Sequence, residues 1–130
     1  MSVVRFGSGT PWESIVGYSR VVVHGDMAWV SGTTATADGE VVCPGDAAGQ
    51  TRQALANLAQ ALERAGFTVA DVVRTRVFVT DISRWEEVGR VHGEVFGDVR
   101  PATSMVQVSA LIDPAMLVEV EADAVRGTGA

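Results

Sequence analysis

Acidic side chains alternate with apolar ones near the C-terminal end of the sequence, in "LVEVEADAV" (117–125), which contains Glu119, Glu121 and Asp123. Successive side chains of a strand point to opposite faces, so these three carboxylates are predicted to share one face. A carboxylate in an enclosed cleft has a raised pKa and serves as a general acid or base, whereas one beside an arginine forms a salt bridge. For Glu119, both interpretations remain open.

Arginine supplies all ten basic residues, because the chain contains no lysine. The planar guanidinium is suited to paired recognition of carboxylates. Arg74 and Arg76 alternate in "DVVRTRVFVTDI" (71–82), where they share a face with Phe78. Arg100 precedes Pro101 and is predicted at a loop or helix end. Carboxylates and guanidinium groups are therefore the candidate groups for catalysis and for ligand binding.

Composition excludes several classes of protein. The net charge is -6, which disfavours a nucleic-acid partner. The single cysteine, Cys43, excludes an internal disulfide and a Cys-based zinc cluster, and we expect neither metal nor cofactor. We find no apolar run of about 20 residues and no secretory signal, which predicts a cytoplasmic protein without a membrane partner. A length of 130 residues predicts one domain, residues 1–130.

The apolar spacing predicts two helices. Leu55, Leu58 and Leu62 recur at helical spacing within residues 47–65, which follow Asp46 as N-cap and precede Gly66. A second amphipathic helix is predicted up to Gly97, with Trp85 on its apolar face. Ser83 and Glu86 are predicted to form its capping box.

About six strands are predicted around these helices. Val-rich runs flank His24-Gly25-Asp26 in residues 19–32, which indicates a hairpin. Further strands are predicted at residues 71–82, 102–109 and 116–125, with a short one at Val41 and Val42. Strands interleaved with two helices predict an α+β layered domain, with both helices on one face of a mostly mixed sheet.

The alternation also predicts which strand residues face the core. We expect three core rows: Val73, Thr75, Val77 and Val79; Ser104, Val106, Val108 and Ala110; and Met116, Val118, Val120, Ala122 and Ala124. Thr103 and Met105 would then lie on the outer face with Arg74 and Arg76. Such a mixed face is either solvated or part of a subunit interface.

Five stretches in this order resemble the RidA/YjgF family of reactive intermediate deaminases, also called endoribonuclease L-PSP or translation inhibitor. They are "GYSRVVVHGDMAWVSGT" (17–33), "QTRQALANLAQALERAG" (50–66), "DVVRTRVFVTDI" (71–82), "RPATSMVQV" (100–108) and "LVEVEADAV" (117–125). The resemblance implies a chorismate-mutase-like subunit in a homotrimer. The sheets would pack into a central barrel, with three small-molecule clefts between subunits.

The same resemblance implies roles for individual residues. Glu119 would be the catalytic group that orients water or relays a proton. Tyr18, Gly32 and the backbone of Met105 would bind substrate. The family's carboxylate-binding arginine belongs to a Pro-Ala-Arg-Ser pattern that here reads Pro101-Ala102-Thr103-Ser104, so Thr103 replaces it.

The loss of that arginine disfavours standard 2-imino acid deamination, because a threonine hydroxyl offers no positive charge. Arg100 lies three residues upstream, roughly 10 Å along an extended chain, and is a poor substitute. Arg20, Arg74 and Arg76 are the candidates for a compensating cation, although each can instead pair with an acidic neighbour.

Two functions remain open from the sequence. One is a hydrolase or tautomerase that acts on a small imine, enamine or related metabolite through Glu119 and water. The other is a trimer that binds a metabolite without turnover. Ribonuclease activity is the least favoured, because the chain is acidic and lacks an obvious His/Lys catalytic set.

Overall fold

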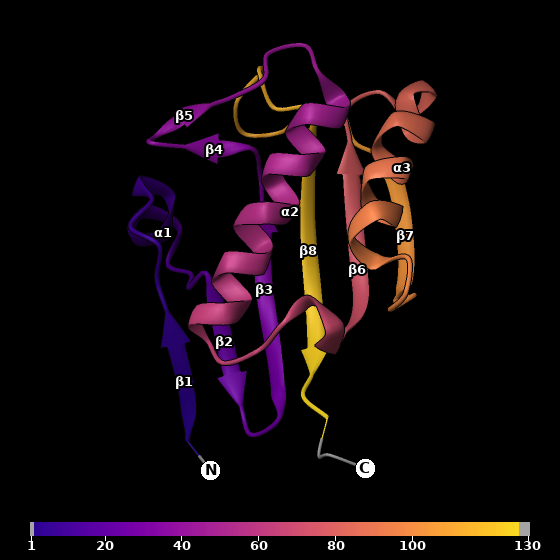
Figure 1. Cartoon of the computed structure of the whole chain (residues 1–130). Coiled ribbons are helices and arrows are strands. Elements are labelled where there is room, and N and C mark those ends of the chain that lie inside the picture. The colour runs from indigo at the N-terminus through magenta and orange to yellow at the C-terminus, as the bar shows by residue number, and fades with distance from the viewer. Residues whose placement is uncertain (1, 128–130) are drawn as a thin grey trace.

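Six strands form one mixed sheet, and two long helices cover one of its faces (Figure 1). The computed structural model describes residues 2–127. The strands of this sheet are β1 (Val3–Phe6), β2 (Val21–His24), β3 (Met27–Thr33), β6 (Val72–Val79), β7 (Ala102–Gln107) and β8 (Val118–Val125). Their order is β1-β2-β3-β8-β6-β7, and only the β6–β7 pair is parallel. The predicted α+β class and six-stranded mixed sheet are confirmed.

The remaining elements surround this sheet. They are the helices α1 (Pro11–Val16), α2 (Ala47–Arg64) and α3 (Trp85–Phe96), the 3-10 turns η1 (Val69–Asp71) and η2 (Ile82–Arg84), and a hairpin of β4 (Thr36–Ala37) and β5 (Glu40–Val41). The predicted strand at Val41 and Val42 thus belongs to a separate hairpin, and β1 completes the main sheet instead. Neither β1 nor α1 was predicted. The reason for β1 is that its valines are exposed at the sheet edge, so no alternating burial pattern marks it.

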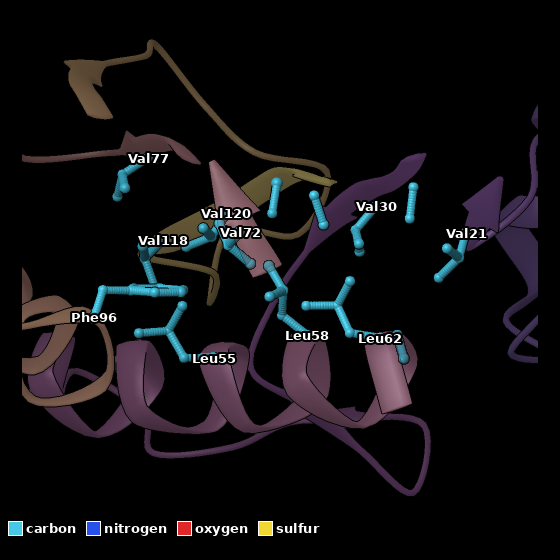
Figure 2. Packing of buried hydrophobic residues seen from close by; sticks show 14 of the residues in the cluster. Val21, Val30, Leu55, Leu58, Leu62, Val72, Val77, Phe96, Val118 and Val120 are labelled. Carbon is cyan, nitrogen blue, oxygen red and sulfur yellow. The ribbon is translucent and has the colours of Figure 1, made fainter. Parts of the chain in front are cut away.

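Helix α2 is confirmed at both ends. The Asp46 carboxylate accepts a hydrogen bond from the Gly49 backbone N–H at 2.9 Å, which caps the first turn. Gly66 follows the helix with φ of 88°, a conformation that glycine adopts without strain. Figure 2 shows the α2 leucines pointing toward the valines of the sheet, which form the core with them.

Strand β8 lies in the middle of the sheet and shows the predicted alternation. Val118, Val120, Ala122 and Ala124 are buried on the helix side. Glu119, Glu121 and Asp123 therefore point to the helix-free face. The β2–β3 hairpin is also confirmed, with Gly25 and Asp26 as its two-residue turn.

The predicted core row of β7 is wrong. The parallel register pairs Thr75 with Thr103 and Val77 with Met105, so Thr103 and Met105 share the helix side with these buried residues. Met105 packs against the core, whereas Val106 is 47% exposed. Two valines in an edge strand suggested the opposite face, but the pairing with β6 decides the orientation.

The predicted burial of Val73 in β6 is also wrong. Val73 is exposed, because an irregularity in the β6–β8 pairing between Val72 and Arg74 shifts the alternation.

The capping box predicted for α3 from Ser83 and Glu86 is wrong, because Ser83 is hydrogen-bonded to Asp81. Its hydroxyl donates to Asp81 at 2.6 Å, and Asp81 caps η2 instead of α3. Helix α3 consequently begins at Trp85, which is 56% exposed instead of lying on the apolar face. The buried face of α3 consists of Val88, Val91 and Phe96.

None of the helices within residues 2–127 combines the length and apolar character needed to cross a membrane.

Candidate functional site

A cavity of about 900 Å³ brings together four of the predicted site residues: Tyr18, Arg20, Gly32 and Glu119. Its walls come from the loop before α1, the β3–β8 pairing, the β4–β5 turn and the last turns of α2. Other wall residues are Thr10, Trp12, Val16, Ser31, Thr33, Asp38, Asn57, Gln60, Arg64, Ile112, Met116 and Glu121.

An irregular stretch of β3 shapes the inner wall of this cavity. The register against β8 shifts between Val30 and Thr33, so Ser31 and Gly32 leave the regular ladder. The Ser31 backbone N–H donates to the Arg20 carbonyl at 3.0 Å, and its hydroxyl donates to the Ser19 carbonyl at 2.6 Å. The bulge is thereby fastened to the chain leading into β2.

The arginine side chain of that segment occupies the bulge. Arg20 Nη1 donates to the carbonyls of Ser31 at 3.3 Å and Gly32 at 2.6 Å, and to Thr33 Oγ1 at 3.2 Å. Its Nη2 donates to the Tyr18 hydroxyl at 3.2 Å. Arg20 is 9% exposed, so a buried positive charge lies in the inner wall.

Gly32 is required by the position of Glu119. A Cβ atom at residue 32 would lie 2.7 Å from the Glu119 carboxyl carbon and closer still to its Oε1. Only a residue without a side chain lets this carboxylate pack directly against the strand. The "SG" pair of the sequence thus makes space for the candidate catalytic acid.

Burial raises the pKa of Glu119, and the nearby Glu121 charge raises it further, whereas Arg20 acts in the opposite direction. Within residues 2–127, no arginine or histidine nitrogen lies within 4.0 Å of the Glu119 carboxylate. A half-buried carboxylate with a raised pKa is suited to act as a general acid or base.

The loop before α1 forms an ordered wall of the cavity. Glu13 accepts hydrogen bonds from the Ser8 backbone N–H at 2.9 Å and from the Thr10 hydroxyl at 2.8 Å. Partial burial acts to raise the pKa of Glu13, but the hydrogen bonds from Ser8 and Thr10 outweigh it and lower the pKa to about 2. Glu13 is therefore ionised at neutral pH and fastens Ser8 and Thr10 to the first turn of α1, which carries the cavity residue Trp12.

Helix α2 contributes wall residues that sequence reasoning missed. Asn57 donates to the carbonyls of Thr34 at 3.0 Å and Thr36 at 2.8 Å, which fastens β4 to the helix. Gln60 and Arg64 lie one turn apart and line the cavity. Their spacing was visible in the sequence, but exposed polar residues on a helix have no signal that separates them from solvated ones.

Thr103 lies outside the walls of this cavity. Its hydroxyl is 2.8 Å from the Thr75 hydroxyl, which in turn is 2.9 Å from His92 Nε2. Burial lowers the pKa of His92, which favours the uncharged imidazole. The hydroxyl of Thr103, where the resemblance leads us to expect an arginine, is thus bonded toward the helix layer.

The other predicted site residues also lie away from the cavity walls of the same chain. Met105 packs against the core, and Arg76 is paired with Glu121 at 3.3 Å and Asp123 at 3.4 Å. Arg74 is paired in register with Asp123 and does not line the cavity. Of the three candidate compensating cations, Arg20 is the one that borders the cavity with Glu119.

Within residues 2–127, no group of three or more His, Cys, Asp or Glu side chains could hold a metal ion.

Known proteins match this chain over nearly its whole length. A RutC family protein of Pyrococcus horikoshii is 34% identical over 97% of this chain and 99% of its own. A crystal structure of a member of the YjgF/YER057c/UK114 family from Mycobacterium tuberculosis is 55% identical, with a TM-score of 0.87, over 95% of this chain and 99% of that one.

A second solved structure agrees with this fold. It is a protein of the conserved Rid family from Yersinia pestis, 31% identical with a TM-score of 0.85, and the match covers 95% of this chain and 99% of that one. The family described as Endoribonuclease L-PSP matches residues 10–126. The five matching stretches, the six-stranded sheet and these relatives together place the chain in the endoribonuclease L-PSP family, also known as the RidA/YjgF family.

Proposed function

We propose that this protein is a RidA-family hydrolase that acts on a small imine, enamine or related metabolite in the Glu119 cavity. The observation that carries the proposal is the packing of the Glu119 carboxylate against Gly32, in a cavity that also holds Arg20 and Tyr18. Its raised pKa matches the demand on a group that both accepts and returns a proton.

The proposed step is the addition of water to a carbon–nitrogen double bond. Glu119 accepts a proton from water as the water oxygen bonds to the imine carbon. Glu119 gives this proton to the nitrogen, which yields a carbinolamine. Glu119 then takes the proton of the new hydroxyl group and passes it to the nitrogen as the carbon–nitrogen bond breaks, so that ammonia or an amine leaves and a carbonyl product remains. Each imine consumes one water, and Glu119 returns to its ionised form.

The substrate differs from the 2-imino acids of the standard family reaction. Thr103 stands at the arginine position, and its hydroxyl is bonded to Thr75, so no guanidinium is supplied from β7. We expect the protein not to accelerate hydrolysis of 2-aminoacrylate. Thr103→Arg is the corresponding gain-of-function variant.

The functional unit is proposed to be a homotrimer with clefts between subunits. Tyr18, Arg20, Gly32 and Glu119 would come from one subunit, and β7 with Thr103 and Met105 from its neighbour. This arrangement would reunite the predicted site residues that one chain keeps apart.

The test is release of ammonia from a panel of N-unsubstituted imines and enamines. We expect turnover by the wild type and a loss of at least about a hundredfold in Glu119→Gln, which keeps the shape of the side chain but removes the base. Glu63→Gln, on the exposed side of α2, is the control and should retain activity. Wild-type rates equal to those without protein would overturn the hydrolase proposal.

The alternative is a metabolite-binding trimer without turnover. It is favoured by the absence of an arginine at residue 103, because a cavity can bind a ligand without the group that activates it. Ligand-dependent thermal stabilisation without product would identify it. Ribonuclease activity is least favoured, because the net charge of -6 opposes the binding of a polyanion.

A further inference from the structure

Arg20 is a buried cation that lacks an acidic partner. It is 9% exposed, and within residues 2–127 no Asp or Glu oxygen lies within 4.0 Å of its guanidinium nitrogens. Burying a guanidinium is costly, and buried charges in proteins are normally paired. Glu119 interacts with Arg20 only at longer range, so the guanidinium has no direct ion-pair partner and can take an anionic ligand.

The protein groups around Arg20 orient it without neutralising it. The carbonyls of Ser31 and Gly32 and the hydroxyl of Thr33 accept from Nη1, and the Tyr18 hydroxyl accepts from Nη2. The Tyr18 ring also lies beneath the guanidinium, with 5.5 Å between the guanidinium carbon and the ring centroid. All of these partners are uncharged, so the side chain is held in place with its charge intact.

One edge of the guanidinium remains available. The hydrogen bonds of Arg20 to other residues of 2–127 use Nη1 and Nη2, and none uses Nε. Every buried polar side-chain atom in this part of the chain has a partner, so Nε is reached from open space. Nε and Nη2 together form an edge that binds carboxylates with two parallel hydrogen bonds.

The outer walls of the cavity are apolar as well as polar. Trp12 is half-buried there, and Val16 and Ile112 are 67% and 62% exposed. A volume of about 900 Å³ exceeds what a three- or four-carbon acid fills, and pockets of this size hold ligands with a ring or a branched chain. The ligand that fits both parts has an anionic end and an apolar end.

We propose that Arg20 binds the carboxylate of an aryl-substituted or branched-alkyl acid, whose apolar group lies against Trp12, Val16 and Ile112. This inference rests on the proposed function in that it uses the same cavity, and it identifies the substrate class. The carboxylate enters from the β2–β3 side, so its anchor is a different residue on a different strand from the family's arginine position at Thr103. A small imino acid would leave the apolar wall empty.

Binding of phenylacetate, compared with its uncharged analogue phenylacetamide, tests the anchor by calorimetry without requiring turnover. We expect the wild type to bind phenylacetate at least about tenfold more tightly than phenylacetamide, and Arg20→Gln to lose this preference. Arg5→Gln removes an exposed arginine outside the cavity and should bind as the wild type does. Equal affinity for the two compounds, or unchanged phenylacetate binding by Arg20→Gln, would overturn the proposal.

Arg20→Lys is a second variant that tests the anchor if Arg20→Gln fails to fold. It keeps the positive charge but loses the two-bond edge, so we expect a circular dichroism spectrum like that of the wild type and phenylacetate affinity reduced at least about tenfold. Wild-type affinity in a folded Arg20→Lys variant would refute the paired contact.

Comparison of acetate with phenylacetate tests the apolar subsite. Acetate should bind more weakly than phenylacetate, and Trp12→Ala should reduce that difference. Equal binding of the two acids would refute the apolar subsite.

Glu119→Gln separates this inference from the proposed function. Removing a nearby negative charge should strengthen phenylacetate binding while it abolishes turnover. If the wild type binds phenylacetate through Arg20 but hydrolyses no imine, the anion site stands and the hydrolase fails. If imines are hydrolysed and phenylacetate binding ignores Arg20, the hydrolase stands and the anion site fails.

Discussion

Gly32 and Glu119 depend on each other at the scale of single atoms. The carboxylate occupies the space that any side chain at residue 32 would need. The same bulge directs the Gly32 carbonyl to Arg20, 2.6 Å from Nη1. One irregular step in β3 therefore positions both an acid and a cation at the cavity wall.

Gly32→Ala should displace the Glu119 carboxylate while preserving the fold. The atoms in conflict belong to the end of a flexible side chain, which can rotate away, so we expect near-native thermal stability and a loss of at least about tenfold in Glu119-dependent turnover. Gly93→Ala is the matched control, because nothing lies within 4 Å of a Cβ there and alanine favours the helix. Native turnover in Gly32→Ala would contradict the role of this contact.

The pH profile should report the environment of Glu119. If its carboxylate is the base, activity falls toward acid with a midpoint above the ordinary glutamate value of 4.5. Glu121→Gln removes the neighbouring negative charge and should move that midpoint to lower pH. Glu86→Gln on α3, outside the cavity, is the control and should leave the midpoint unchanged. An unchanged midpoint in Glu121→Gln would show that Glu121 does not influence the pKa of Glu119.

The same raised pKa has a consequence for stability. The folded state disfavours the ionised form of Glu119, so stability is lost as the pH rises through the raised pKa. Glu119→Gln should therefore melt at a higher temperature than the wild type at about pH 7, and the difference should vanish below the ordinary glutamate pKa of 4.5. A lower melting temperature at neutral pH would mean that favourable contacts of the carboxylate outweigh its desolvation.

Helix α2 has two functions at the scale of secondary structure. Its leucines fill the core beneath the sheet (Figure 2). Its last turns place Gln60 and Arg64 at the cavity. Asn57 and the fully buried Gln50 fasten it to neighbouring loops; Gln50 donates to the Ala115 carbonyl at 2.9 Å and accepts from the Leu117 N–H at 2.8 Å. The helix thereby holds the segment that leads into β8 and Glu119.

Leu58→Ala should destabilise the whole domain. Leu58 is 0% exposed, and its truncation leaves a cavity that costs about 2–5 kcal/mol. The measurement is the free energy of unfolding in urea, with Glu63→Ala as the exposed control on the same helix, expected within about 0.5 kcal/mol of the wild type. A cost below about 1 kcal/mol for Leu58→Ala would contradict its place in the core.

At the scale of the whole molecule, the helix-free face of the sheet is a surface that exposes large apolar side chains. Met27, Trp29 and Val106 are 44%, 39% and 47% exposed, while Arg76 bridges Glu121 and Asp123 between them. The α2–α3 layer covers the opposite face (Figure 1). A sheet with large apolar side chains on its open face is suited to association, which agrees with the proposed trimer.

The trimer proposal predicts a mass in solution of three times the 13.7 kDa subunit, measured by light scattering after size exclusion. Trp29→Glu places a charge on the open face and should yield smaller species. Ile15→Glu changes a residue that is 80% exposed on α1 and should leave the mass unchanged. A wild type that elutes as a monomer at micromolar concentration would refute the trimer.

The sequence by itself determined the α2 helix, the β2–β3 hairpin and the alternation of β8, because caps, turns and side-chain periodicity act within a few residues of the chain. It also determined that Glu119 shares a face with Glu121. The tertiary structure decided that Arg20 borders the cavity, whereas Arg76 is neutralised by Glu121 and Asp123. It also decided that Thr103 is bonded to Thr75. Both outcomes depend on strand register and on a bulge, which are set by contacts between residues far apart in the chain.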